Sequence, residues 1–211
     1  MHEQCYVEGG IGLFLAFLFP AFAVMFIFFI VGAESASLLQ EREAGTLRRL
    51  LTAPIPRWTV IAGKMLAYGL LVCLQVVILF TIRYVLFDIT LGRAPLALVV
   101  LTITVAFVAV SLGMLVAALA KTSKQADNVG MVLAFVFAGM GGAFPTWPPM
   151  FRSAGFIGTL SKFTPHAHAL EGYYSVMAEN ATFTQILPQL GFLWLMGIVF
   201  FLIAVWRFRF E

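Results

Sequence analysis

Five long stretches without a charged residue dominate this 211-residue chain, and the shortest of them has 18 residues. A helix needs about 20 apolar residues to cross the roughly 30 Å of hydrocarbon in a bilayer. The composition agrees, since 62% of the residues are hydrophobic and 11% are charged, whereas soluble domains have roughly 45–50% and about 25%. The short alternating segments of a transmembrane β-barrel are not seen. The sequence therefore predicts an all-α integral membrane protein. The five runs are Ile11–Ala33, Met65–Ile82, Ala94–Ala120, Asn128–Phe151 and Asn180–Trp206.

We expect these runs to form five transmembrane helices in a single transmembrane domain that covers residues 1–211. The fourth run is unusual, because glycine and proline are concentrated in its second half, and proline prevents a straight helix from continuing. The segment Gly139–Leu160 is therefore expected to be either a loop at the membrane surface or an element that re-enters the membrane. An outer helical segment is expected over about 145–180, with a helix that starts at Pro165. The expected spans are about 11–38, 62–86, 94–120, 126–143 and 183–206.

The distribution of lysine and arginine predicts the orientation. Counted over alternate sides of the five spans, one side carries nine of these residues and the other carries four. Positively charged loops stay in the cytoplasm. We therefore expect a multi-pass protein of the plasma membrane, with its N-terminus outside and its C-terminus in the cytoplasm.

The first cytoplasmic loop predicts a short amphipathic helix over about residues 43–55. Leu47, Leu50 and Leu51 have the spacing that places them on one helical face, and Pro54 limits the end of the helix. Two interpretations are equally compatible with this pattern. The helix could lie on anionic lipid headgroups, with its leucines in the membrane boundary, or it could be a docking site for a cytoplasmic partner.

The same loop carries a family resemblance. The residues Glu41-Arg42-Glu43, Gly45-Thr46-Leu47 and Arg49-Leu50-Leu51, followed by Pro54 and Lys64, resemble the corresponding segment of type-2, export-type permeases of ATP-binding-cassette transporters. Further similarities follow in the same order over about residues 14–207: Gly113, Lys121-Thr122-Ser123, Gln125-Ala126, Pro145-Thr146-Trp147-Pro148, Thr164-Pro165-His166 and Leu170-Glu171-Gly172.

The resemblance implies a function and a set of partners. It implies a permease domain that forms the translocation path of an exporter, binds a separate cytoplasmic ATPase subunit and pairs with a second copy or a related permease. Such permeases usually have six spans, and the span without a counterpart here is the first. The residues implied to couple to the ATPase are Glu41, Glu43, Gly45, Thr46, Leu47, Arg49, Leu50, Leu51 and Pro54.

No nucleotide site is expected within this chain. A phosphate-binding loop requires the pattern Gly-x-x-x-x-Gly-Lys-Ser/Thr, and Gly63-Lys64 is followed by Met65. ATP and magnesium would then be bound by the separate subunit, and we expect neither a cofactor in this chain nor a nucleic acid partner. His166, His168 and Glu171 were considered as metal ligands, but histidines two residues apart do not share a helical face. A polar surface helix after Pro165 is the favoured interpretation.

Charged residues near the membrane bear on the competing functions. None of the five runs contains Asp, Glu or Lys, and this disfavours a proton- or sodium-coupled carrier. Arg83 and Asp88 are expected at the outer end of the second span, where Arg83 could snorkel or form a local ion pair. The alternative to an exporter subunit is an ATP-independent scaffold or lipid-interacting protein. The substrate class stays open among lipids, drugs and polysaccharides.

An outer gate is the last expectation. An exporter must open outward, and a non-spanning element at the outer mouth can move without exposing its backbone to lipid. The gate is assigned to the segment Gly139–Leu160, and its alternative is a static cap at the membrane surface. The residues expected to form it are Gly142, Phe144, Pro145 and Trp147.

Overall fold

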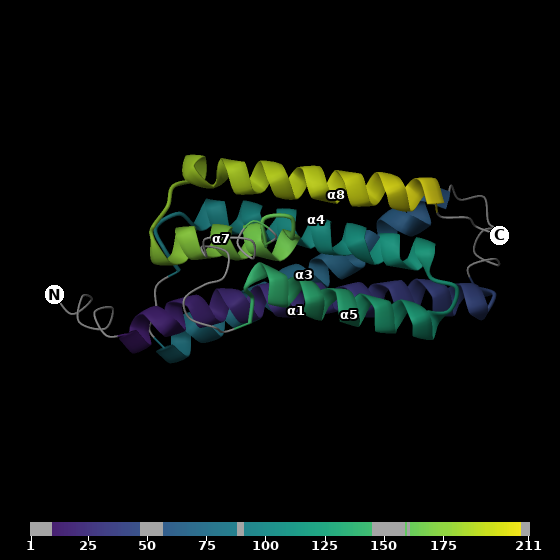
Figure 1. Ribbon diagram of the computed structural model, residues 1–211, viewed down its shortest axis with the longest axis horizontal. Coiled ribbons are helices and arrows are strands. Elements are labelled where there is room, and N and C mark those ends of the chain that lie inside the picture. Colours follow the sequence, from purple (N-terminus) through teal and green to yellow (C-terminus); the bar gives the residue numbers. More distant parts are fainter. Residues whose placement is uncertain (1–9, 47–56, 88–90, 145–158, 160, 208–211) are drawn as a thin grey trace.

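The computed structural model describes residues 10–46, 57–87, 91–144, 159 and 161–207, and every regular element within them is a helix (Figure 1). The prediction of an all-α protein is confirmed. The helices are α1 (Gly10–Glu43), α3 (Arg57–Phe87), α4 (Pro95–Leu119), α5 (Ser123–Gly141), α7 (Pro165–Ala178), the short 3-10 helix η2 (Phe183–Ile186) and α8 (Leu187–Arg207).

Four stretches of the described chain are long and apolar enough to cross a membrane. They have 25 to 29 residues and mean hydropathies between 2.2 and 2.6, so the protein is a multi-pass membrane protein. Helix α5 has 19 residues and is not among the four, so the expectation of five crossings stays a prediction. The four stretches are Phe17–Glu43, Thr59–Phe87, Pro95–Leu119 and Phe183–Arg207.

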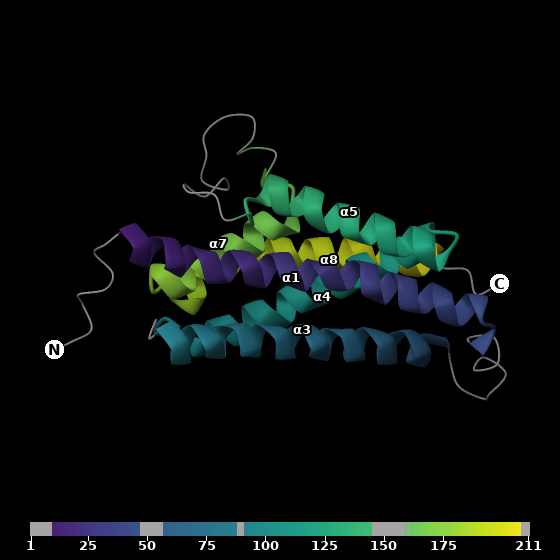
Figure 2. The same ribbon diagram turned by 90° about the horizontal axis from the view of Figure 1, so that it is seen from below.

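Helices α1 and α4 form the centre of the bundle. Most of the apolar stretch of α4 is buried (72%) and so is more than half of that of α1 (56%), whereas the values for α3 and α8 are 17% and 22%. In Figure 2, α3 and α5 lie on opposite sides of α1, and α8 packs along α4. The exposed leucines, isoleucines and valines of α3 and α8 are suited to contact with lipid, which is as apolar as these side chains.

Helix α1 continues to Glu43, which is five residues beyond the expected end of its span. Gln40, Glu41, Arg42 and Glu43 are all good helix formers, and none of them interrupts the backbone hydrogen bonds. The helix ends where Gly45 adopts a positive φ of 71°. Glycine takes this left-handed conformation without steric cost and commonly follows the last turn of a helix.

Helices α5 and α7 share one side of the bundle. Figure 1 shows α5 beside the half of α1 that ends at Glu43, while α7 lies at the opposite half. Helix α5 ends at Gly141, and the next residue, Gly142, has a φ of 76°. Helix α7 begins after Thr164, whose hydroxyl accepts a hydrogen bond from the amide of Ala167. The glycine-rich break expected from the sequence therefore lies between these two short helices.

One expectation about polar residues is wrong, and of the two alternatives for Arg83 only snorkelling is excluded, since Asp88 lies outside the described residues. Helix α7 is not a polar surface helix, because ten of its 14 residues are buried between its neighbours, and His166 among them is fully buried. Arg83 does not snorkel out of the bundle either. Its side chain is fully buried, and its guanidinium lies 3.0 Å from the sulfur of Met177. Helix packing, which the sequence of one segment does not reveal, encloses both side chains.

Candidate coupling site and outer segment

Of the residues expected to couple to an ATPase, those that the structure describes lie at the end of α1. Glu41 and Glu43 belong to its last turn, and Gly45 and Thr46 form the turn that follows. The amide of Gly45 donates to the carbonyl of Arg42, and the hydroxyl of Thr46 donates to the carbonyl of Glu41 at 2.9 Å. This turn closes the helix and satisfies carbonyl groups that have no partner within α1. The remaining coupling residues, Leu47, Arg49, Leu50, Leu51 and Pro54, lie outside the described residues, as does most of the expected helix 43–55.

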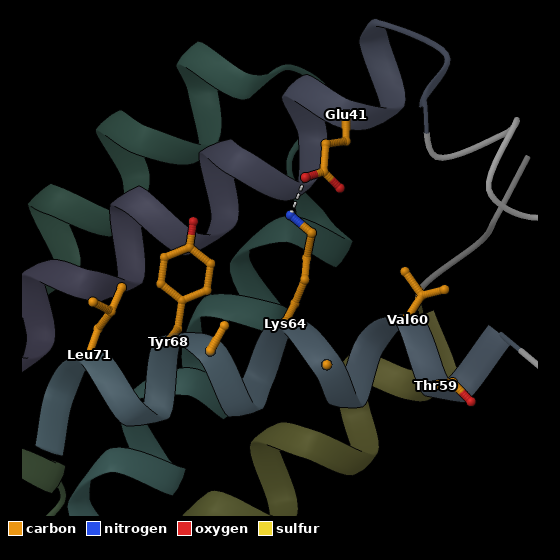
Figure 3. Close-up of a pocket in the computed structure, with 8 residues that line it drawn as sticks. Glu41, Thr59, Val60, Lys64, Tyr68 and Leu71 are labelled. Carbon is orange, nitrogen blue, oxygen red and sulfur yellow. Dashed lines mark hydrogen bonds and ion pairs between the residues drawn. The ribbon is translucent and has the colours of Figure 1, made fainter.

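Glu41 connects α1 to α3. Its carboxylate forms an ion pair of 2.7 Å with the ammonium group of Lys64 (Figure 3). The same ammonium group donates a hydrogen bond of 3.1 Å to the hydroxyl of Ser37. The Glu41 side chain is 41% exposed and that of Lys64 is 16% exposed. An exposed ion pair contributes only about 0–1 kcal/mol to stability, so this contact holds two helix ends in register more than it stabilises the fold.

A groove runs along α3 beside this ion pair. Its volume is 570 Å³, and Figure 3 shows Tyr68 and Leu71 on the same side of α3 as Lys64. Gly63 and Ala67 are small residues that leave the groove open, and a Cβ added at Gly63 would meet no atom within 4 Å. The groove is mainly apolar, with one ion pair at its edge. The lining residues are Glu41, Thr59, Val60, Gly63, Lys64, Ala67, Tyr68 and Leu71.

Glu43 connects α1 to α5. Its two carboxylate oxygens accept hydrogen bonds of 2.8 Å from the amide and from the hydroxyl of Ser123, the first residue of α5. The first amides of a helix have no partner within the helix and favour a negative charge. Thr122 caps the same end by accepting from the amide of Gln125. The end of α1 therefore holds α3 through Glu41 and α5 through Glu43.

The segment expected to lie on the outer side begins where α5 meets α7. Gly141 allows a close approach, since a Cβ at this position would lie 2.5 Å from the Cβ of His166 and 2.9 Å from the amide nitrogen of Ala167. The ring of Phe144 turns back toward α5 and lies 3.4 Å from the corresponding position at Gly139. Of the expected gate residues, Gly142 and Phe144 are described, whereas Pro145 and Trp147 lie outside the described residues.

The two histidines of α7 have different environments. The His166 ring stacks on Phe28 of α1, with ring centroids 3.9 Å apart. The His168 ring lies beside Phe192 of α8, and its Nε2 atom is 2.8 Å from the carbonyl oxygen of Lys162. Packing against two different helices therefore explains the orientation of both rings.

Sequence reasoning missed an acidic residue inside the bundle. Glu34 is fully buried in α1, within the apolar stretch Phe17–Glu43. Glu34 ends the first uncharged run, Ile11–Ala33, although it lies within the expected span of about 11–38. The depth of Glu34 could have been inferred from its separation from Glu41, because seven residues correspond to about two turns of the helix.

Comparison with known proteins covers nearly the whole chain. Residues 6–206 match the family described as "ABC-2 family transporter protein". The chain is also similar to the linearmycin resistance permease protein LnrN of Bacillus subtilis (strain 168), with 27% identity over 172 residues. This alignment covers 82% of the present chain and 44% of the relative, so the matched part spans less than half the length of that protein. No solved structure matches significantly.

Proposed function

The chain belongs to the ABC-2 transporter family and is a transmembrane subunit of an ATP-binding-cassette transporter, and we propose that it works in an ATP-driven exporter. A separate cytoplasmic ATPase subunit would bind the segment Glu41–Trp58, and a second copy or a related permease would complete the translocation path. The ATPase subunit would bind ATP and magnesium, and this chain would bind no cofactor.

The observation that carries this proposal is the pair of contacts at the end of α1. A partner that moves the loop after Thr46 would also move Glu41 and Glu43, because these two residues immediately precede the loop in the chain. Glu41 transmits that movement to α3 through Lys64, and Glu43 transmits it to the start of α5 through Ser123. The loop is therefore connected to two helices besides its own.

Helix α5 extends this connection toward the other end of the bundle. It runs from Ser123 to Gly141, where it packs against His166 of α7. A shift of α5 along its axis would press directly on α7, because no side chain separates them at Gly141. This arrangement supports the assignment of an outer gate to the segment Gly139–Leu160, with Gly142, Phe144, Pro145 and Trp147.

The orientation follows from the same proposal. The end of α1 would face the cytoplasm, where nine of the lysines and arginines gather, and the junction of α5 and α7 would lie toward the outside. The relative in Bacillus subtilis is named a resistance permease, and this name supports outward transport as the direction.

Co-purification with the ATPase subunit tests the proposal. The full chain is produced together with its candidate ATPase subunit, and Leu50→Asp is compared with Thr184→Asp, which changes an exposed residue outside the coupling segment. A charge at position 50 should remove an apolar anchor and reduce co-purification at least tenfold, whereas the control should retain it. Unchanged co-purification and unchanged substrate-stimulated ATPase activity in Leu50→Asp would contradict the proposal.

A further inference from the structure

Glu34 is a buried acid without a hydrogen-bond partner. Its side chain is fully enclosed, and neither carboxyl oxygen has a partner among the described residues. The side chain lies across Gly113 of α4, where an added Cβ would overlap one carboxyl oxygen and lie 3.1 Å from the Cδ carbon. Because Gly113 has no side chain, the carboxyl group of Glu34 occupies the space that a side chain at position 113 would fill.

The surroundings of Glu34 are apolar on both sides. Val31, one turn earlier on α1, belongs to the main hydrophobic core. Leu38, one turn later, belongs to a smaller hydrophobic cluster with Met114 and Ala117 of α4. Glu34 lies nine residues before the end of α1, which places it about 14 Å from that end. The carboxyl group therefore lies between two apolar clusters, away from the aqueous end of the bundle.

None of the helices packed against α1 supplies a free countercharge for Glu34 among the described residues. On α3, Lys64 has an electrostatic interaction with Glu34, but its ammonium group already donates hydrogen bonds to Glu41 and Ser37. Helix α4 contains no acidic or basic residue. On α5, Asp127 lies beside Gly32 and is an acid like Glu34, so it supplies no countercharge. On α7, His166 stacks on Phe28, nearly two turns away.

An ionised carboxylate in such a place is strongly destabilising, because it has lost its water and gained no partner. The neutral acid has a much smaller cost of burial. Ionisable residues inside a membrane domain are accordingly rare, and they commonly mark proton or ion pathways.

We propose that Glu34 is a proton-binding site inside the helix bundle. The carboxyl group holds a proton while α1 and α4 are packed as observed, and it releases the proton to water when these helices separate. Acidic conditions then favour the packed state and alkaline conditions favour separation, because a ligand stabilises the state that binds it. The role of this step in a transport cycle rests on the proposed function, whereas the proton site itself does not.

Infrared spectroscopy of the full chain in lipid bilayers tests the site without the ATPase subunit. The wild-type protein should show, at neutral pH, the carbonyl band of a protonated carboxylic acid, and Glu34→Gln should lack it. The matched control, Glu171→Gln, changes a half-buried acid on α7 and should retain the band. The absence of such a band in the wild type, or its presence in Glu34→Gln, would overturn the proposal.

A second variant covers the case in which Glu34→Gln does not fold. Gly113→Ala places a methyl group where the carboxyl lies, so the acid is displaced, and its band should shift or disappear at neutral pH. An unchanged band in Gly113→Ala would contradict the assigned position of the proton.

The pH dependence of transport tests the consequence for the cycle. In the complete complex, the turnover of the wild type should vary with pH, and Glu34→Gln should flatten that profile while Glu171→Gln leaves it unchanged. An infrared band that behaves as expected, together with an identical pH profile in Glu34→Gln, would retain the proton site and overturn its coupling to transport. If the complex does not transport at all, the proposed function fails and the infrared result still decides the site.

Discussion

Two acidic residues at the end of α1 hold different helices, although only one residue separates them. Residues two apart on a helix point to nearly opposite sides, so Glu41 reaches α3 and Glu43 reaches α5. The family resemblance singled out both residues, but it could not indicate that each has its own partner. The partners lie 23 and 80 residues away in the sequence.

The ion pair between Glu41 and Lys64 should affect coupling more than stability. We expect Glu41→Gln and Lys64→Gln each to change the free energy of unfolding by less than about 1 kcal/mol, because the pair is partly exposed. Transport per ATP hydrolysed should fall in both variants, and the double variant should be no worse than either single one. Thermal unfolding and a transport assay with the ATPase subunit measure the two effects. Additive losses would indicate that the two residues act independently.

The hydrogen bonds between Glu43 and Ser123 give a separate prediction. Glu43→Gln and Ser123→Ala should each reduce transport, because α5 would no longer follow the end of α1. A double-mutant cycle should give a coupling term between these residues, whereas Glu43 combined with Lys64 should give none. A cycle without coupling between Glu43 and Ser123 would separate α5 from the coupling loop.

Among the helices, the runs of uncharged residues indicated where most elements lie but not how they end. The first span was expected to end at about residue 38, whereas α1 continues to Glu43, and a criterion based on charge did not indicate the depth of Glu34. The exposure of α7 was also misjudged. The sequence from Pro165 to Ala178 contains two histidines, a glutamate and two tyrosines, and only the packing of α1, α4, α5 and α8 around it determines that most of them are buried.

The contact between α1 and α5 depends on two glycines. A Cβ at Gly130 would lie 2.5 Å from the Cα of Gly32, so the two backbones touch directly. We expect Gly130→Ala to destabilise the protein by about 1–3 kcal/mol through overpacking. Gly69→Ala on α3 is the matched control, because its Cβ would meet no atom within 4 Å, and it should be neutral or slightly stabilising.

Unfolding in a mild detergent measures both glycine variants. The prediction fails if Gly130→Ala and Gly69→Ala unfold at the same temperature. An intermediate result, with a loss below about 0.5 kcal/mol for Gly130→Ala, would show that the helices can separate slightly without losing other contacts.

We expect the two ends of the bundle to face opposite sides of the membrane. In Figure 1 the start of α1 and the end of α8 lie at opposite ends of the bundle. The count of lysines and arginines predicts which end faces the cytoplasm.

Cysteine labelling determines the orientation. In a background without Cys5 and Cys73, Lys124→Cys and Thr184→Cys place single reactive groups at exposed positions near the starts of α5 and α8. A membrane-impermeant reagent should label position 184 in intact cells, and it should label position 124 only after the membrane is opened. The reverse pattern would invert the proposed topology and place the coupling loop outside.

The short length of α5 has a consequence for biogenesis. Its 19 residues begin with the polar sequence Ser123-Lys124-Gln125 and contain Asp127 and Asn128, so this helix partitions poorly into lipid by itself. Helix α1 offers it a backbone surface at Gly32 and a hydrogen-bonded end at Glu43. Insertion of α5 should therefore require that α1 already lies in the bilayer. In a cell-free translation system with microsomes, α5 should become protected from protease only when α1 precedes it on the same chain.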